Sequence, residues 1–489
     1  MKLRVRGLGL GAGRPVAFLN EATAHILNVH AGDRVAIANS NKMIIAVVDI
    51  LKNFLDKNEI SLSEEATALL DLKPGEYVDV ILTLIPQSTQ YIIKKLKGEA
   101  LTKEEIYIII KDIVNNSLFE AEIAYFVSGV YKYGMSFQEL VYLTEAMYKT
   151  GIRLTWNLKN IVDKHSIGGV AGNRTTPIVI SICAALGIVM PKTSSRAITS
   201  AAGTADVMET ITNVNLSPRQ MKDIVNKTGA CLAWGGSLGL APADDKLIRV
   251  ERLLNLDPES QLIASIISKK LSTGSTHVLI DIPYGKGAKV SRRGALKLKN
   301  KFLNIGKHFN LKIKVILTDG SQPIGNGIGP VLEMLDILAV LKRENDAPKD
   351  LEDKSIVLAG IILEMMKKAK KNEGKSMALD ILDSGKALKK FNEIIKEQGR
   401  RKGLLRAGRF RHIIRARKSG KIKAINNEKI NYLARLLGCP QDKSSGIYLY
   451  KHKNENVKVN EPILTLYAES GKKLRKAMKY FSEARIILI

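Results

Sequence analysis

A glycine-rich stretch, KHSIGGVAGNRTTPIVISICAALG, carries residue types that hold phosphate. Its glycine loop runs directly into an apolar helical pattern that begins at about Thr175, and Lys164 and Ser166 precede the loop. Free backbone N–H groups at the start of a helix, next to a lysine and hydroxyl groups, form a cradle for phosphate. The alternative is a tight structural loop, which needs no lysine. The loop glycines are Gly168, Gly169 and Gly172.

A second stretch, SSRAITSAAGTADVMET (residues 194–210), combines small side chains with hydroxyl groups and one arginine. Small side chains let a ligand approach the main chain, and Arg196 supplies a rigid positive fork, so the chemistry suits an anion. The hydroxyl groups belong to Ser194, Ser195, Thr199, Ser200 and Thr204. A tight turn whose hydroxyls cap their own backbone explains the same residues, and the stretch alone leaves both interpretations open.

A third glycine-rich stretch, GLGLGAGRP (residues 7–15), comes close to the fingerprint of a dinucleotide-binding loop. That fingerprint needs a strand before it and a long helix after it. Here a single short strand precedes the glycines, Pro15 follows them, and no long helical pattern comes next. The sequence therefore disfavours a dinucleotide site at this position.

The elements around these stretches differ along the chain. Short β-rich segments separated by turn residues come first, and helical periodicity follows to about residue 155. Glycine-rich loops then alternate with helices and short apolar strands such as HVLIDIP and KVILTDG, the pattern of an α/β domain. After helical stretches around 330–397 the strand and turn patterns return, and RHIIRARKSGKIKAI predicts a hairpin around Ser419 and Gly420.

Charge is the most unusual feature of the composition. The 489 residues include 76 basic and 48 acidic ones, a net charge of +28. Such a surface attracts nucleic acids or phosphorylated small molecules. The basic segments at 367–375 and 400–424 lack the interleaved aromatic residues that stack on bases, so we interpret them as solvated faces and expect no specific nucleic-acid partner.

Several classes of protein are disfavoured by what the sequence lacks. No apolar run approaches the ~20 residues of a membrane span, and the first residues lack the apolar block of a signal peptide, so we expect a cytoplasmic protein that does not bind membranes. Cys183, Cys231 and Cys439 are far apart and none has the paired spacing of metal ligands. We therefore expect neither a disulfide framework nor a metal site.

Four stretches together carry a resemblance to a known family. KHSIGG, the stretch that begins at Ser194, LAPADDKLIRVERLLNLDPESQLIASIISKK and TDGSQPIGNGIGPVLEMLDIL resemble the thymidine/pyrimidine nucleoside phosphorylase family. The similarity runs from about residue 88 to the C-terminus. The additional β-rich domain before residue 86 is similar to the archaeal branch of that family, whose members convert a nucleoside 5′-monophosphate and inorganic phosphate to free base and ribose 1,5-bisphosphate.

The resemblance implies an α/β multidomain fold of a pentosyltransferase. A helical domain of the nucleoside phosphorylase type would face an α/β domain across a cleft, with a small β-rich N-terminal domain and an α+β C-terminal domain. The expected boundaries are 1–85 for the β-rich domain, 86–160 for the helical domain with a returning segment at about 240–275, 161–400 for the α/β domain and 401–489 for the C-terminal domain. The resemblance also implies a homodimer or larger homo-oligomer and no cofactor, because inorganic phosphate is a co-substrate.

The resemblance implies a set of binding residues. The attacking phosphate would be held by Lys164, Ser166, Ser194 and Thr204. AMP would be bound by Gly169, Ser195, Arg196, Ala197, Ile198, Thr199, Ser200, Thr204, Ser265 and Lys289. Lys269 lies four residues after Ser265, on the same face of a helix, and is expected near the base or ribose together with His165. Where the nucleoside enzymes carry a histidine, this chain has Ser200, which follows Thr199, and these two small hydroxyl residues leave room for a second phosphate.

The same resemblance assigns proton donation to the leaving base to Asp257. Burial would have to raise the pKa of this carboxyl for it to hold a proton near neutrality. An aspartate followed by proline is otherwise typical of a turn before a helix. His165 either orients ribose or base or packs beside the loop, and the sequence leaves these two roles equal.

The expected reaction is phosphorolysis of nucleoside 5′-monophosphates, AMP and also CMP or UMP, in nucleotide salvage and AMP catabolism. A pyrimidine nucleoside phosphorylase acting on thymidine or uridine is the close alternative. The arginine that those enzymes use for the pyrimidine carbonyl is absent here, because Val250 or Glu251 stands at its position. A phosphoribosyltransferase of the anthranilate type, which needs Mg²⁺, and a nucleic-acid-binding protein are the remaining alternatives.

Overall fold

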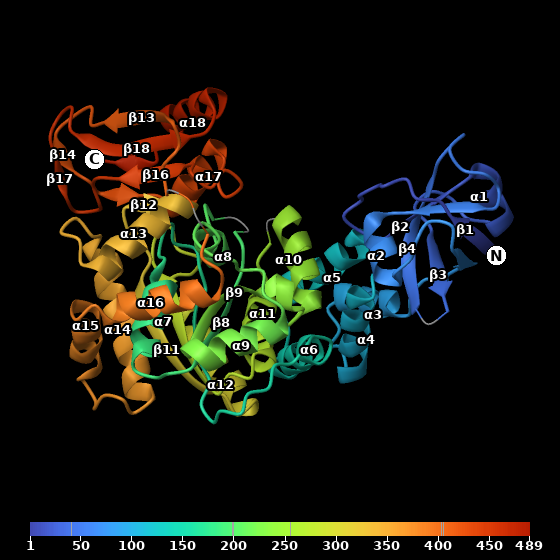
Figure 1. Ribbon diagram of the computed structural model, residues 1–489, viewed down its shortest axis with the longest axis horizontal. Coiled ribbons are helices and arrows are strands. Elements are labelled where there is room, and N and C mark those ends of the chain that lie inside the picture. Colours follow the sequence, from blue (N-terminus) through green and yellow to red (C-terminus); the bar gives the residue numbers. More distant parts are fainter. Residues whose placement is uncertain (41, 198–199, 255, 402, 404) are drawn as a thin grey trace. The chain divides into compact units, whose positions relative to one another are not determined.

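The computed structural model describes residues 1–489 except 41, 198–199, 255, 402 and 404, so Ile198 and Thr199 lie outside the described residues. The chain divides into two compact units (Figure 1). Unit 1 comprises Met1–Gly151 and Ala241–Ser265, and unit 2 comprises Ile152–Leu240 and Ile266–Ile489. The chain therefore leaves unit 1, builds part of unit 2, returns, and leaves again.

The N-terminal part of unit 1 is a closed β-barrel with the strand order β1-β5-β2-β4-β3-β6. Its strands are β1 (Lys2–Val5), β2 (Val16–Leu19), β3 (Arg34–Asn39), β4 (Lys42–Ile50), β5 (Glu59–Leu62) and β6 (Tyr77–Leu82). Alternate residues such as Leu3 and Val5 point into the barrel core. The short helices α1 (Glu21–Leu27) and α2 (Glu64–Leu70) begin at side-chain caps from Asn20 and Ser63. The predicted β-rich character is confirmed.

The rest of unit 1 is helical. Its helices are α3 (Ser88–Leu96), α4 (Lys103–Val114), α5 (Glu120–Tyr133), α6 (Phe137–Lys149) and α10 (Pro242–Leu254). Capping boxes at Thr102 and Ser136 start α4 and α6. A buried ion pair of 2.8 Å joins Lys95 on α3 to Glu139 on α6. Helix α11 (Glu259–Ser272) begins in unit 1 and ends in unit 2.

Parallel strands organise the α/β part of unit 2. Strands β7 (Val162–Ser166), β10 (His277–Tyr284) and β11 (Lys312–Asp319) form a sheet of order β11-β10-β7, in which every pair is parallel. A separate parallel pair of β8 (Met190–Ser194) and β9 (Ala230–Trp234) lies next to β7, where the Val162 N–H donates to the Val189 carbonyl at 2.9 Å. The carboxyl ends of these strands lie at a common edge, where α/β proteins bind ligands.

Helices cover this sheet. They are α7 (Thr175–Ala185), α8 (Thr204–Met208), α9 (Pro218–Thr228), α12 (Arg292–His308), α13 (Pro330–Lys342), α14 (Lys349–Met365), α15 (Gly374–Asp383) and α16 (Lys386–Glu397), with a 3₁₀ turn η1 (Gly235–Leu238). Every residue of α7 from Thr175 to Ala184 is buried, as expected for a helix enclosed by other helices and the sheet. The predicted strands HVLIDIP and KVILTDG and the predicted helix start at Thr175 are confirmed.

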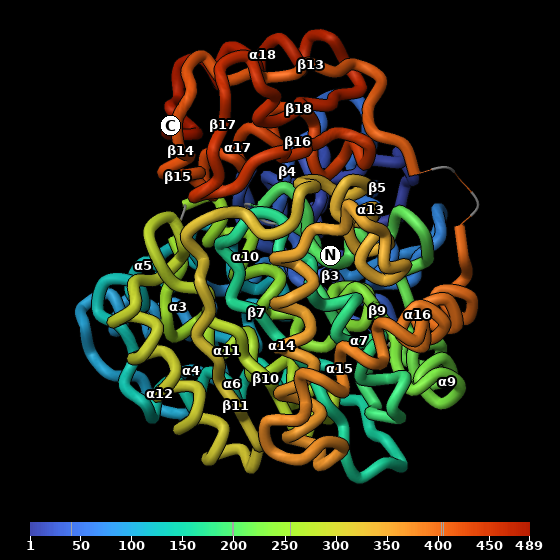
Figure 2. The backbone as a smooth tube through the Cα atoms, turned by 90° about the vertical axis from the view of Figure 1, so that its left-hand side faces the viewer, coloured from blue at the N-terminus to red at the C-terminus, as the bar shows by residue number. Residues whose placement is uncertain are grey.

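The C-terminal part of unit 2 is α+β (Figure 2). A sheet of order β12-β16-β18-β13 combines β12 (Gly327–Ile328) from the α/β part with β13 (Phe410–Arg415), β16 (Gly446–Leu449) and β18 (Pro462–Ala468). Short pairs join β14 (Gly420–Lys421) to β17 (Asn456–Val457) and β15 (Ala424–Ile425) to β19 (Ile487–Leu488). Helices α17 (Asn427–Leu437) and α18 (Gly471–Glu483) pack with this part.

The hairpin predicted around Ser419 and Gly420 is wrong. Strand β13 pairs with β18 and β14 pairs with β17, so the two neighbouring strands separate to distant partners. The turn residues Ser419 and Gly420 indicate a change of chain direction, but they do not predict which strand β13 or β14 pairs with. Among the described helices, none is both long enough and apolar enough to cross a membrane.

Candidate active site

Lys164 lies near the carboxyl end of β7 with 1% of its surface exposed. Its ammonium donates to the hydroxyl of Thr175 at 2.7 Å, in the first turn of α7. Burial lowers the pKa of Lys164 to about 8, and the positive charges of Lys354 and Arg174 act in the same direction, while the Asp281 carboxylate opposes them. A further anion beside this ammonium would therefore be strongly favoured.

Ser166 ends β7, and its hydroxyl oxygen is buried with no hydrogen-bond partner among the described residues. A buried hydroxyl that no protein group satisfies is available to bind a ligand. The glycine loop that follows has Gly168 and Gly169 at φ values of 83° and 86°. A Cβ at Gly169 would lie 2.7 Å from the Cγ of Lys289, so the fold brings these two predicted residues together.

Arg174 joins the glycine loop to the 194–210 stretch, and sequence reasoning missed it. Its guanidinium donates to the Thr204 hydroxyl at 2.8 Å and to the Ala202 carbonyl at 2.7 Å. It also pairs at 2.7 Å with Glu333, which is 1% exposed. Thr204, predicted to bind phosphate, is thereby held beside the first turn of α7. A motif search looks at each stretch separately and gives no signal for a side chain that connects them.

Carboxylates hold the 194–203 loop in shape. Arg196 binds both oxygens of Glu209, at 2.7 and 2.8 Å, and Asp206 at 3.2 Å. These contacts and Lys443 lower the pKa of Glu209 to about 2. Asp206 also accepts the N–H groups of Ala197 and Gly203, at 2.7 and 2.9 Å. The charge of Arg196 is thus paired with carboxylates in this structure, and its predicted role toward nucleotide phosphate stays a prediction.

The hydroxyl groups of this loop have mixed surroundings. The Ser194 hydroxyl donates to the Ala233 carbonyl at 3.1 Å, and the Ser200 hydroxyl donates to the Ala202 carbonyl at 3.1 Å. Ser195 is exposed. Each hydroxyl oxygen retains lone pairs, and a small movement of a loop side chain frees the proton for a ligand.

Helix α17 fixes both loops from the C-terminal part of unit 2. The side-chain oxygen of Asn427 accepts the Ala171 N–H at 3.0 Å, and its amide donates to the Gly320 carbonyl at 2.9 Å. Asn431, one turn later, accepts the Ala201 N–H at 3.0 Å. Both asparagines are buried. The C-terminal part thus contributes to the geometry of the site, which the sequence analysis did not predict.

A buried cluster of charges joins β7 and β8, which carry Asp163 and Lys192, to α11, which carries Lys270. Asp163 pairs with Lys270 at 2.6 Å and with Lys192 at 3.0 Å. Burial, followed by the charges of these two lysines, holds the pKa of His165 well below its usual value. His165 is therefore a neutral imidazole at neutral pH and cannot act as an imidazolium acid.

Asp257 lies in unit 1, in the segment between α10 and α11, and its side chain is exposed. The burial that proton donation would require of this carboxyl is not provided by unit 1. Ser265 and Lys269 lie four residues apart on α11, as predicted. The remaining described site residues belong to unit 2, and the contacts described above join most of these to one another.

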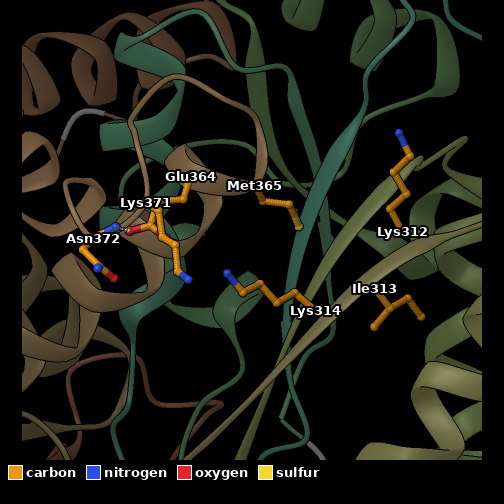
Figure 3. A pocket seen from close by; sticks show the side chains of 7 residues that line it. All are labelled: Lys312, Ile313, Lys314, Glu364, Met365, Lys371 and Asn372. Atoms are coloured by element: carbon orange, nitrogen blue, oxygen red, sulfur yellow. Dashed lines mark hydrogen bonds between the residues drawn. The ribbon is translucent and has the colours of Figure 1, made fainter.

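A hollow of about 630 Å³ on unit 2 lies away from this site (Figure 3). It is lined by Lys312, Ile313, Lys314, Glu364, Met365, Lys371 and Asn372. Lys312 begins β11, so the hollow is at the amino end of a strand whose carboxyl end faces the opposite edge of the sheet. Size alone therefore does not identify the candidate site.

We expect Ser166→Ala to weaken phosphate use without weakening the fold. The substitution removes a buried hydroxyl that has no partner among the described residues, so the free energy of unfolding should rise by about 1 kcal/mol, while the KM for phosphate increases several-fold. Ser355→Ala is the matched control, because the buried Ser355 hydroxyl donates to the Leu351 carbonyl at 2.7 Å. It should lower stability and leave the KM for phosphate unchanged. Loss of stability in Ser166→Ala would contradict the ligand role.

Gly203→Ala should distort the 194–203 loop. An added Cβ would lie 2.3 Å from the Ser195 carbonyl oxygen and within 2.7 Å of two further backbone atoms, which cannot move away independently. We expect a loss of about 1–3 kcal/mol in stability and a fall of at least about tenfold in kcat/KM. Gly294→Ala is the control, because its Cβ would make only ordinary contacts in α12. Thermal unfolding and initial rates measure both effects, and a Gly203 variant with wild-type values would show that the loop is unimportant.

Comparison with known proteins adds independent information. Residues 158–388 match the a/b domain of the glycosyl transferase family, residues 89–151 match the helical bundle domain of that family, and residues 421–487 match the pyrimidine nucleoside phosphorylase C-terminal domain. The fold is similar to that of anthranilate phosphoribosyltransferase from Thermus thermophilus, with a TM-score of 0.53, 17% identity, and coverage of 63% of this chain and 98% of that chain.

Curated relatives extend over nearly the whole chain. The chain is 46% identical over 483 residues to a protein of Pyrococcus abyssi named AMP phosphorylase, covering 98% of this chain and 96% of that protein. It is 40% identical over 494 residues to a protein of Natronomonas pharaonis named AMP phosphorylase, covering 100% of this chain and 98% of that protein. It is also 41% identical over 492 residues to a putative thymidine phosphorylase of Legionella pneumophila (strain Paris), covering 100% and 95%.

Proposed function

The chain belongs to the thymidine/pyrimidine nucleoside phosphorylase family, and from this premise we propose that it is a pentosyltransferase that cleaves nucleoside 5′-monophosphates with inorganic phosphate. With AMP the products are adenine and ribose 1,5-bisphosphate. The observation that carries the proposal is the pair formed by the buried Lys164 ammonium and the unpartnered Ser166 hydroxyl, at the carboxyl end of β7 beside the first turn of α7. A buried positive charge beside a hydroxyl and a helix start supports the binding of a small anion.

The proposed reaction moves the ribosyl group from the base to phosphate. A phosphate oxygen bonds to the anomeric carbon as the bond from that carbon to the base nitrogen breaks, through an oxocarbenium-like state. Lys164 and the N–H groups of the glycine loop hold the attacking phosphate, which lowers the entropy of the encounter. The base leaves with the electron pair and takes up a proton, for which Asp257 is the proposed donor.

A second activity, phosphorolysis of thymidine or uridine, has a specific observation in its favour. The Legionella pneumophila relative named putative thymidine phosphorylase is as similar over the full chain as the AMP phosphorylase of Natronomonas pharaonis. The two activities differ in the 5′-phosphate, which only the nucleotide substrates carry. The deciding experiment incubates the protein with phosphate and a panel of nucleosides and 5′-monophosphates, and identifies the sugar product. Ribose 1,5-bisphosphate supports the first proposal, and a nucleoside-derived sugar 1-phosphate formed at higher kcat/KM overturns it.

Ser200→Ala tests the proposed 5′-phosphate site. Its hydroxyl lies in the 194–203 loop, and a hydrogen bond to a charged phosphate contributes about 1.5–3 kcal/mol. We therefore expect kcat/KM for AMP to fall roughly 10- to 100-fold, while the slower reaction of adenosine is unchanged. Equal losses with AMP and adenosine would remove Ser200 from this role.

Further properties complete the proposal. The reaction as written needs no metal or other cofactor, so activity should survive a chelator, whereas a phosphoribosyltransferase that uses Mg²⁺ would lose it. We also propose that the protein acts in the cytoplasm, on a phosphorylated metabolite, as a homodimer or larger homo-oligomer. Light scattering of the purified protein at working concentration gives the mass that tests the last point.

A further inference from the structure

Unit 1 contains a cavity of about 450 Å³ between the barrel and the helices α5 and α10. Its lining comes from the 13–15 segment, β4, α2, the segment before α5, α5 itself and α10. A volume of this size falls within the range of ligand pockets for small molecules. The sequence analysis and the proposed reaction give this cavity no role.

The walls of the cavity are largely apolar. They are formed by Pro15, Ile45, Val47, Leu69, Leu118, Phe119, Ile123 and Val250. The Phe119 ring is fixed in place by the Arg34 guanidinium, which stacks 3.7 Å from the ring centre. Leu69 is 48% exposed although it lines the cavity. Apolar walls with one ordered aromatic ring suit the flat face of a ligand ring.

Two arginine side chains at the cavity, Arg14 and Arg249, make no short ion pair with a described residue. No described residue forms a hydrogen bond or ion pair with the exposed Arg14 guanidinium. Arg249 approaches the Gly13 carbonyl at 3.5 Å and Glu120 at 3.9 Å, both too long for strong interactions. Arginine is the side chain best suited to bind phosphate with two parallel hydrogen bonds.

Of the other charged residues that line the cavity, Lys246 and Glu65 are engaged in short hydrogen bonds, whereas Glu120 lies 3.9 Å from Arg249. Lys246 donates at 2.7 Å to the Ile113 and Val114 carbonyls and to the Asn116 side-chain oxygen, and so satisfies the end of α4. Glu65 accepts the N–H groups of Ala12 and Gly13 at the cavity edge. The negative charge of Glu65 is thereby used to fix the 7–15 stretch, while the two arginines remain available to a ligand.

The 7–15 stretch is the glycine-rich motif that the sequence disfavoured as a dinucleotide loop. Gly13 has a φ of 69°, which favours glycine, and no atom lies within 4 Å of the position of its Cβ. Gly13, Arg14 and Pro15 line the cavity, so the end of this stretch forms part of its edge. The conformation of Gly13 therefore helps to place Arg14 there.

We propose that this cavity is a second, non-catalytic site that binds a small anion with a flat ring, the chemistry of a nucleoside 5′-monophosphate. Arg14 and Arg249 bind the phosphate, and the apolar walls beside Phe119 enclose the base. Asn116 also lines the cavity, and its side-chain oxygen accepts from Lys246, which leaves the amide N–H groups as the proposed donors to the sugar or base.

Ligand binding in the cavity should affect catalysis through helix α10. This expectation rests on the proposed function. Lys246, Arg249 and Val250 line the cavity from α10, and this helix ends at Leu254, three residues before Asp257. A ligand held by these three residues would restrain α10, the helix that precedes Asp257 in the chain. Occupancy should therefore change kcat.

Equilibrium dialysis of labelled AMP tests the site with the full chain, at physiological salt and without phosphate, so that no turnover occurs. Wild-type protein should bind one more AMP per chain than the double variant Arg14→Gln/Arg249→Gln. Arg4→Gln is the matched control, because Arg4 is an exposed barrel arginine that does not line the cavity. It should bind as the wild type does. Equal binding by the wild type and the double variant overturns the proposal.

A second variant removes the space instead of the charge. Leu69→Trp adds a bulky ring at a half-exposed position, so the protein should fold and should lose the same bound AMP. Adenosine and inorganic phosphate, each carrying half of the proposed ligand, should compete for this site much more weakly than AMP. Full competition by phosphate alone would show an anion site without recognition of the ring, and would overturn the proposal.

The same measurements separate this proposal from the proposed function. If the catalytic site binds no nucleotide, the wild type still binds one AMP and the double variant binds none. If the cavity binds none, the wild type and the double variant bind the same amount and share the same kcat. Each result identifies which of the two sites has failed.

Discussion

Lys164→Met is expected to lower kcat/KM for phosphate by roughly 10²- to 10³-fold, the effect of removing one preorganised electrostatic group. Methionine has a similar length and no charge, so it fills the space of the buried side chain. It leaves no carboxylate unpaired, because Asp281 keeps its contact with Lys354 at 3.1 Å and accepts from Thr318 at 2.6 Å. The binding of AMP without phosphate should change little. Steady-state rates over a range of phosphate concentrations measure the effect, and a variant with near wild-type kcat/KM would exclude Lys164 from phosphate binding.

The pKa of Lys164 adds a pH test. In the folded protein this pKa is about 8, below its ordinary value of 10.5. Since the free enzyme determines kcat/KM, the value for phosphate should fall as pH rises through about 8 and the ammonium loses its proton. Between about 8 and 10.5 the unfolded chain binds more protons than the folded one, so this group makes stability rise with pH across that window. Lys164→Met should abolish that contribution.

Asp257→Asn should lower kcat by roughly 10²- to 10⁴-fold, the usual contribution of a general acid. Asparagine keeps the size and hydrogen bonding of the side chain but cannot deliver a proton. Nucleotide binding should be nearly unchanged, because the proton moves in the transition state. Asp257 is exposed in unit 1, so the substitution should not affect folding. Single-turnover rates with AMP give the measurement.

A substrate with an activated leaving group provides the control for Asp257. Such a group departs without protonation, so the asparagine variant should recover most of the wild-type rate with it. Equal failure with both substrates, in a folded protein, would mean that Asp257 has another role. His165→Asn is the comparison variant. Because the pKa of His165 is held well below its usual value, this variant should keep the basic limb of the wild-type pH profile.

Local patterns in the sequence predicted the elements that carry the site. The glycine loop before Thr175 does lead into a buried helix. An apolar run of this length is too long for a typical strand, so the sequence predicts a buried helix there. The carboxyl ends of β7 and β8 do carry Lys164, Ser166 and Ser194. Strand patterning also predicted a β-rich start, although closure into a barrel depends on pairing between strands and is invisible in local alternation.

Contacts between distant segments were beyond the sequence analysis. Arg174 reaches Thr204 across 30 residues, and Asn431 reaches Ala201 across 230. The sequence around Arg174 or Asn431 does not predict which distant residue each side chain contacts. The pairing of Arg196 with Glu209 was equally open, because an arginine among hydroxyl groups fits a ligand or a carboxylate. The predicted hairpin failed for the same reason, since β13 finds its partner in β18.

The bond from Ala171 to Asn427 spans 256 residues, and this separation matters while the protein is being made. A ribosome adding about 5–20 residues per second needs roughly 10–50 s to travel from one to the other. During that interval the glycine loop has already been synthesised. Asn427, which accepts the Ala171 N–H, and Asn431, which accepts the Ala201 N–H, have not. The glycine loop is therefore anchored only near the end of translation, and a nascent chain released before residue 427 should carry a formed β7 and α7 and an unanchored loop between them.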